Sequence, residues 1–131
     1  MEETLRYDTS VPAWRRITKR PVTLGGVALP AGAKLFLWLG ATGRDPAAFP
    51  VPERFDLGRA DARHHLAFGK GIHYCAGASL GKLEARLAVD GLVTRFPGLR
   101  LVEDQRIPFH PNISFRGPLA LWLSARGEPR R

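Results

Sequence analysis

The feature that most constrains this 131-residue chain is a glycine-rich loop that holds its only cysteine. The loop spans residues 68–77, reads Phe-Gly-Lys-Gly-Ile-His-Tyr-Cys-Ala-Gly, and runs directly into a helical pattern. A thiolate at the N-terminus of a helix is stabilised by the helix dipole and by unpaired backbone N–H groups. The glycines at 69, 71 and 77 allow tight turns and the close approach of a flat, bulky ligand. The loop therefore predicts a thiolate at Cys75 that binds a metal.

The residues after the cysteine predict a long helix over 76–96. Apolar side chains recur there at spacings near i, i+3 and i+4, and this period predicts one stripe that faces a core. The stripe consists of Leu80, Leu83, Leu87, Leu92 and Val93. Pro97 and Gly98 cannot extend a helix, so we expect it to end at about Phe96.

Short elements are predicted before the loop. Residues 2–8 resemble the last turns of a helix. No N-cap residue precedes them, so we expect the first turns of this helix to belong to a larger parent domain. Residues 34–39 are apolar on both faces, which favours a buried strand. A short helical turn is expected at 40–45. Near the end of the chain, the alternation of residues 99–101, 112–117 and 119–123 predicts short strands with a closing hairpin.

A hairpin is predicted over residues 14–29. One arm would contain 16–18, the other 27–29, and the turn would lie at Gly25-Gly26. This hairpin adds a small sheet to the predicted helices.

A long coil is predicted over residues 45–66. The segment has three prolines and scattered charges but no hydrophobic period, and a loop of this length in a compact domain is usually either disordered or functional. Phe49 and Phe55 supply aromatic anchors, which favours an ordered coil.

The pattern Phe-Gly-x-Gly-x-His-x-Cys-x-Gly, from Phe68 to Gly77, resembles the haem-binding loop of the cytochrome P450 family of haem-thiolate monooxygenases. The resemblance implies an α+β fold with a mainly helical parent. Residues 1–131 would form the C-terminal, proximal part of one such domain, with short sheets, a meander coil at 45–66, a cysteine loop at 67–77 and a long helix at 76–96.

The same resemblance assigns roles around the cofactor, which would be haem b, iron protoporphyrin IX. Cys75 would be the axial ligand of the haem iron, and its thiolate would donate electron density to the metal. Backbone N–H groups near Ala76 and Gly77 would bind the sulfur. Phe68, next to Gly69, would shield the sulfur from water. His73 would face a haem propionate.

Further roles are implied away from the loop. Glu3 and Arg6, three residues apart on the first helix, would join Arg54 of Pro52-Glu53-Arg54-Phe55 in a buried structural network. A second propionate partner would be Arg16. Arg15 is the alternative, because the spacing from Arg6 allows the match to the family to shift by one residue. The substrate pocket of the family corresponds here to seven positions: Val11, Pro12, Ala13, Trp14, Ile113, Ser114 and Phe115.

Two functions from different classes remain open. The first is the proximal part of a monooxygenase that inserts one oxygen atom of O₂ into a hydrophobic organic substrate, using electrons from a ferredoxin or flavin reductase. The second is a haem-binding module or truncated remnant without monooxygenase activity. No sequence of the oxygen-activating type Ala/Gly-Gly-x-Asp/Glu-Thr occurs here, so the isolated segment is expected to be inactive. A cysteine hydrolase that uses Cys75 and His73 fits poorly, because residues two apart seldom present a nucleophile and its base.

The net charge of +8 raises the question of nucleic-acid binding. The basic residues are spread along the chain rather than grouped, and no nucleic-acid motif is present. We expect no nucleic-acid partner, and a basic face for an acidic electron-transfer protein is the more specific interpretation. No apolar run approaches the ~20 residues that span a bilayer and no signal peptide is recognised, so a soluble, cytoplasmic protein is expected.

Overall fold

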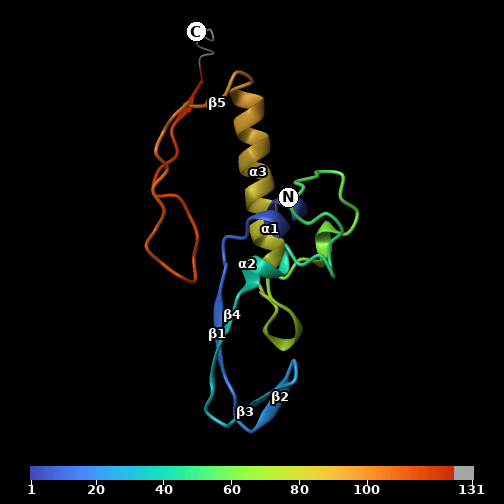
Figure 1. Cartoon of the computed structure of the whole chain (residues 1–131). Helices are drawn as coiled ribbons and strands as arrows, with labels where there is room; N and C mark the ends of the chain where they lie inside the picture. The colour runs from blue at the N-terminus through green and yellow to red at the C-terminus, as the bar shows by residue number, and fades with distance from the viewer. Residues whose placement is uncertain (126–131) are drawn as a thin grey trace.

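The computed structural model describes residues 1–125, and short elements in it surround one long helix (Figure 1). The helices are α1 (Glu2–Tyr7), α2 (Leu39–Thr42), the 3₁₀ turns η1 (Ala62–His64) and η2 (Gly71–His73), and α3 (Ala78–Arg95). The strands are β1 (Trp14–Ile17), β2 (Val22–Leu24), β3 (Val27–Leu29), β4 (Lys34–Leu37), β5 (Arg100–Leu101) and β6 (Leu123–Ser124). The predicted helix at 2–8, the turn at 40–45 and the long helix after the cysteine are confirmed by α1, α2 and α3.

The predicted hairpin over 14–29 has the right turn but the wrong partner for its first arm. β2 pairs with β3 across Gly25 and Gly26, whose positive φ values of 55° and 81° suit a tight hairpin turn. β1 instead pairs antiparallel with β4, from Trp14 opposite Leu37 to Ile17 opposite Lys34.

Thr18 explains this pairing, because it turns the chain out of β1. Its hydroxyl donates to the Pro30 carbonyl at 2.6 Å and accepts the Ala33 N–H at 2.9 Å. The β2–β3 hairpin is therefore an extension inserted between two longer partners, visible at one end of the molecule (Figure 1).

The predicted burial of β4 and of the stripe on α3 is wrong within this chain. Phe36 and Leu37 are exposed, and so are the stripe residues Leu80, Leu83 and Leu87. The β1–β4 sheet has only two strands, and α3 contacts few of the other described elements. The secondary structure thus forms as expected, while its apolar faces stay uncovered by residues 1–125.

The buried interior lies where α1 meets the coil. It is assembled mainly from small apolar residues and one aromatic ring: Ala13, Phe49, Ala62, Ala67 and Ala78. Two charged residues of α1, Glu3 and Arg6, are buried with them. A polar network therefore occupies the centre of the best-packed region.

The segment after α3 returns alongside that helix (Figure 1). β5 and β6 pair, and an isolated bridge joins Phe109 to Pro118, so the segment closes on itself as predicted. The strands predicted at 112–117 and 119–123 are wrong, because these residues form bends and coil apart from Leu123 in β6. Arg116 attaches this segment to the end of α1, since its N–H donates to the Ser10 carbonyl at 2.8 Å and its guanidinium pairs with Asp8 at 2.9 Å.

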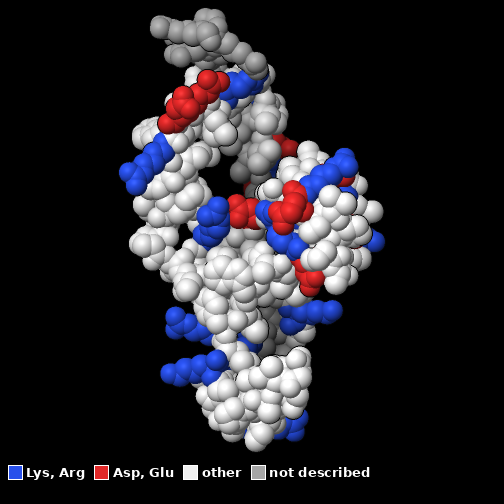
Figure 2. Space-filling view, viewed as in Figure 1, with Lys and Arg blue, Asp and Glu red and all other residues white. Residues whose placement is uncertain are grey.

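Within residues 1–125, no helix combines the length and the hydropathy that crossing a bilayer requires. Lys and Arg side chains are dispersed over the visible face and form no continuous patch there (Figure 2).

Candidate functional site

The cysteine loop is closed by its own backbone. The Cys75 N–H donates to the Phe68 carbonyl at 2.9 Å, and the Tyr74 N–H donates to the Gly71 carbonyl at 3.0 Å. Gly69 and Gly71 both have a φ of 74°, a conformation that side chains disfavour. These contacts fold the ten-residue pattern into a compact turn in front of α3.

The thiol of Cys75 is free and exposed, three residues before α3 begins. The 18 residues of α3 direct the positive end of the helix dipole toward this turn. The sulfur therefore lies where a thiolate is stabilised and where it can reach a ligand outside the chain.

The donor set around the sulfur fits a haem-bound thiolate. In the described part of the chain, the backbone N–H groups of Ala76 and Gly77 have no hydrogen-bond acceptor. Ile72, in the same loop, is 98% exposed and presents an apolar surface. Free N–H donors next to a thiolate are the outer contacts that tune a metal ligand, and an exposed apolar side chain suits a flat porphyrin.

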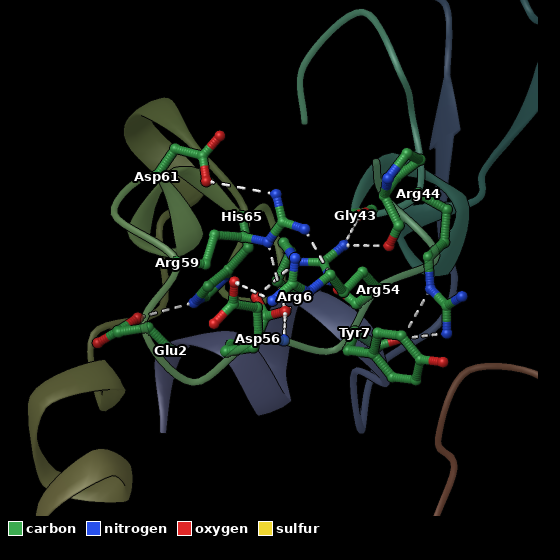
Figure 3. A network of polar contacts seen from close by, with 12 residues as sticks. Glu2, Arg6, Tyr7, Gly43, Arg44, Arg54, Asp56, Arg59, Asp61 and His65 are labelled. Atoms are coloured by element: carbon green, nitrogen blue, oxygen red, sulfur yellow. Dashed lines mark hydrogen bonds and ion pairs between the residues drawn. The ribbon is translucent and has the colours of Figure 1, made fainter. Parts of the chain in front are cut away.

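A buried network links α1 to the coil (Figure 3). The guanidinium of Arg6 holds Glu3 with two hydrogen bonds, at 2.6 and 2.8 Å. Its remaining N–H groups donate to three backbone carbonyls, those of Gly43, Pro52 and Arg54. All five donors of Arg6 are therefore used, in the bidentate geometry that gives the strongest ion pairs.

The guanidinium that joins this network from the coil belongs to Arg59, so the prediction of Arg54 is wrong at that position. Arg59 Nε lies 3.4 Å from Glu3 Oε1, and its side chain is 9% exposed. Arg54 contributes only its carbonyl, while its own side chain is 71% exposed and lies 3.7 Å from Asp56. The turn that directs the Arg54 carbonyl inward leaves its side chain outside.

A second arginine, unpredicted from the sequence, fastens the end of α1. Arg44 lies 3.6 Å from the centre of the Tyr7 ring, donates to the Tyr7 carbonyl at 3.1 and 2.9 Å, and pairs with Glu53. Phe55, an aromatic anchor of the coil, meets the same tyrosine edge to face at 5.3 Å. The helix is thus attached to the coil by cation–π, hydrogen-bond and aromatic contacts.

We expect Glu3 to make the protein less stable in acid. Hydrogen bonds from Arg6 are the main reason that the pKa of the Glu3 carboxyl falls from 4.5 to about 2; burial opposes the shift, and the Asp56 N–H and the charge of Arg59 add to it. A lowered pKa stabilises the fold above pH 4.5 and loses this effect as the pH falls toward 2. The loss amounts to about 3 kcal/mol. Urea unfolding between neutral pH and pH 2 should show it in the wild type and not in Glu3→Gln; parallel curves would contradict the assignment.

Gly43 is predicted to tolerate no side chain. A Cβ at this position would overlap the backbone carbonyl of Arg6, which cannot move without shifting α1. Gly43→Ala should therefore cost about 3 kcal/mol, as overpacking against a fixed backbone does. Gly81→Ala in α3 is the matched control, since a Cβ there meets no atom within 4 Å and helix propensity improves by up to about 1 kcal/mol. Thermal unfolding compares the two variants, and equal melting temperatures would count against this packing.

Some of the predicted pocket residues meet in one cavity. An open cavity of about 620 Å³ is lined by Trp14, Ile113, Ser114 and Phe115, together with Arg15, Pro111 and Asn112. The rings of Trp14 and Phe115 pack edge to face in this lining, with centroids 6.1 Å apart. Val11 and Pro12 are half-buried outside this lining, and Ala13 is fully buried. Two segments a hundred residues apart therefore form one wall.

The predicted propionate partners differ in exposure. Arg15 lines the cavity, whereas Arg16 is half-buried and donates to the Arg15 carbonyl at 2.8 Å. His73 is exposed in η2. Phe68 is half-buried and lies against the rings of His65 and Tyr74, with centroids 5.9 and 6.3 Å away.

Comparison with known proteins places this site in a family. The family model described as "Cytochrome P450" matches residues 1–117. The cytochrome P450 monooxygenase PikC of Streptomyces venezuelae is 44% identical over 136 aligned residues, which cover 100% of this chain and 32% of that protein. The 6-deoxyerythronolide B hydroxylase of Saccharopolyspora erythraea is 41% identical, over 89% of this chain and 29% of that protein.

Solved structures agree with this placement. The P450 heme domain of Tepidiphilus thermophilus superposes with a TM-score of 0.89 at 44% identity, covering 93% of this chain and 29% of that chain. This chain therefore spans about a third of the length of the relatives that it matches. The matched fold, the cysteine loop and the buried Glu3–Arg6 pair lead to one conclusion: the chain belongs to the cytochrome P450 family and corresponds to part of its domain.

Proposed function

We propose that this segment is the proximal, haem-binding part of a haem-thiolate monooxygenase that inserts one oxygen atom of O₂ into a hydrophobic organic substrate. The exposed thiol of Cys75, held by the Phe68 carbonyl at the start of α3, is the observation that carries the proposal. Haem b, when bound, supplies the oxygen-activating iron. Cys75 ligates it, and the N–H groups of Ala76 and Gly77 orient and stabilise the thiolate.

The remaining roles concern binding. Phe68 and Gly69 form the wall beside the sulfur, and His73 reaches one propionate. Arg15 is a better candidate than Arg16 for the second propionate, because Arg15 lines the cavity while Arg16 is engaged with the Arg15 backbone. The buried network of Glu3, Arg6 and Arg59 holds the coil at 45–66 against α1. This coil lies behind the loop at 67–77 and the helical segment at 76–96.

We infer that further polypeptide covers the apolar faces in the working protein. Leu80, Leu83 and Leu87 are 52–61% exposed on α3, and Trp38 is 51% exposed next to β4. Contiguous exposed apolar surface on a soluble domain usually marks an interface. Residues 1–131 would then act as one portion of a larger haem domain, called here the complete domain.

The partners follow from this assignment. Trp14, Ile113 and Phe115 make the cavity wall largely apolar, which suits a hydrophobic substrate. Electrons would come from a ferredoxin or flavin reductase in the cytoplasm.

A chimera tests the proposal. This segment would replace the matching third of PikC, and haem content, the carbon monoxide spectrum of the reduced protein and product formation would be measured with redox partners supplied. Oxygenation of the host's substrate supports a working monooxygenase portion. Haem bound through a thiolate without turnover would instead favour a non-catalytic module, and a soluble chimera without haem would contradict both.

A further inference from the structure

A second polar cluster lies beside the Glu3–Arg6 network and faces the cysteine loop. The carboxylate of Glu2 accepts from His65 Nε2 at 2.9 Å through one oxygen and from Lys82 Nζ at 3.1 Å through the other. His65 and Lys82 are 63 and 80 residues away in the sequence. One carboxylate of α1 therefore joins the segment that enters the loop to the helix that leaves it.

The backbone determines the role of His65 in this cluster. Its Nδ1 accepts the N–H of Ala67 at 3.1 Å, so the hydrogen of the ring lies on Nε2 and is donated to Glu2. The side chain of His65 is 4% exposed, and Figure 3 shows its ring directed at Glu2. The cluster thus fixes the ring of His65 and the backbone of Ala67 together.

Both partners of Glu2 lie against Phe68. The ring of His65 is 5.9 Å from the Phe68 ring, and Lys82 Nζ lies 5.9 Å from the same centroid. The carbonyl of Phe68 accepts the N–H of Cys75. The backbone of Phe68 is therefore bonded directly to that of the thiolate ligand.

The charges of the cluster are complementary, although the side chains of Lys82 and Glu2 are 34% and 36% exposed. The pKa of Glu2 is lowered: burial opposes ionisation, but hydrogen bonds from Lys82 and His65 outweigh it. Glu3, the adjacent residue, directs its carboxylate to Arg6 and the coil instead. The two neighbouring glutamates therefore serve different parts of the site.

We propose that Glu2, His65 and Lys82 form a clamp of positioning residues that sets the place of Phe68 and, through it, the ligation of haem iron by Cys75. The inference rests on the proposed function. The two glutamates of α1 then have different roles. Glu3 maintains the fold around the cofactor, and Glu2 controls the fraction of haem that is bound by the thiolate and the reduction potential of the iron. Outer contacts of this kind commonly alter metal binding by ~10- to 100-fold when they are removed.

The test uses Glu2→Gln and Lys82→Met in the complete domain, with the Soret spectrum of the reduced carbon monoxide complex and the reduction potential measured per bound haem. Both variants should raise the non-thiolate fraction of that spectrum several-fold and shift the potential in the same direction. The double variant should shift both readouts no further than the stronger single variant, because the residues act through one contact.

The control is Glu84→Gln, which removes the same charge from an exposed residue of α3 that has no polar partner among residues 1–125. It should match the wild type. Potentials that shift in opposite directions in Glu2→Gln and Lys82→Met would show a plain charge effect and overturn the clamp, as would wild-type spectra in both. A wild-type domain without a thiolate band would instead refute the proposed function.

Discussion

Arg6→Ala should abolish haem incorporation into the complete domain. The substitution removes five hydrogen bonds at once and leaves the Glu3 carboxylate without its bidentate partner. The carbonyls of Gly43 and Pro52 lose their Arg6 donor, and the Arg54 carbonyl keeps only its bond from Arg59. Breaking a buried ion pair by removing one partner typically costs about 3–5 kcal/mol. That is a large share of the stability of most domains, so the coil at 45–66 should lose its fixed position.

Glu3→Ala should have the same result for the complementary reason. It would leave Arg6, whose side chain is fully buried, without a counter-charge. Arg6→Lys should recover little, because an ammonium group has three donors and no planar fork to satisfy the five acceptor contacts.

Two arginines of the coil provide the matched comparison. Arg59→Ala should lower haem content and stability appreciably, because its buried guanidinium contacts Glu3 and the carbonyls of Pro50, Val51 and Arg54. Arg54→Ala should stay within about 0.5 kcal/mol of the wild type, since its side chain is exposed. Both variants are compared with the wild type by haem content per protein and by urea unfolding. Normal haem content in Arg6→Ala, or equal damage from Arg54→Ala, would refute this account of the network.

The choice between Arg54 and Arg59 shows where sequence reasoning reaches its limit. Periodicity and turn-forming residues are local signals, and they are sufficient for α3 and the hairpin turn at Gly25-Gly26. The coil has no period, so nothing in it tells which of two nearby arginines points inward. The motif around Arg54 drew the prediction to that residue, while the structure uses its carbonyl.

Long-range contacts were equally out of reach. The β1–β4 pairing depends on the corner at Thr18, and the Glu2 cluster joins residues up to 80 positions apart. The stripe on α3 was expected to be core because an apolar helical face requires a covering layer. The period predicts α3 correctly, but no layer among residues 1–125 covers its apolar face.

Cys75→Ser should remove thiolate ligation altogether. The chain has one cysteine, so no other residue of this segment can supply a thiolate. An alcohol at this position is a far weaker donor to iron, and we expect haem to be lost or held by a different ligand. Cys75→His is the informative companion, because imidazole is also an axial ligand of haem and should move the spectrum to the imidazole type while keeping the cofactor.

The most direct measurement is therefore the absorption spectrum of the reduced, carbon monoxide-bound complete domain in three forms: wild type, Cys75→Ser and Cys75→His. We expect a Soret band at the thiolate position in the wild type, its disappearance in Cys75→Ser, and an imidazole-type band in Cys75→His. A thiolate band that persists in Cys75→Ser, or a haem-loaded wild type without one, would contradict the assignment of Cys75 as the axial ligand.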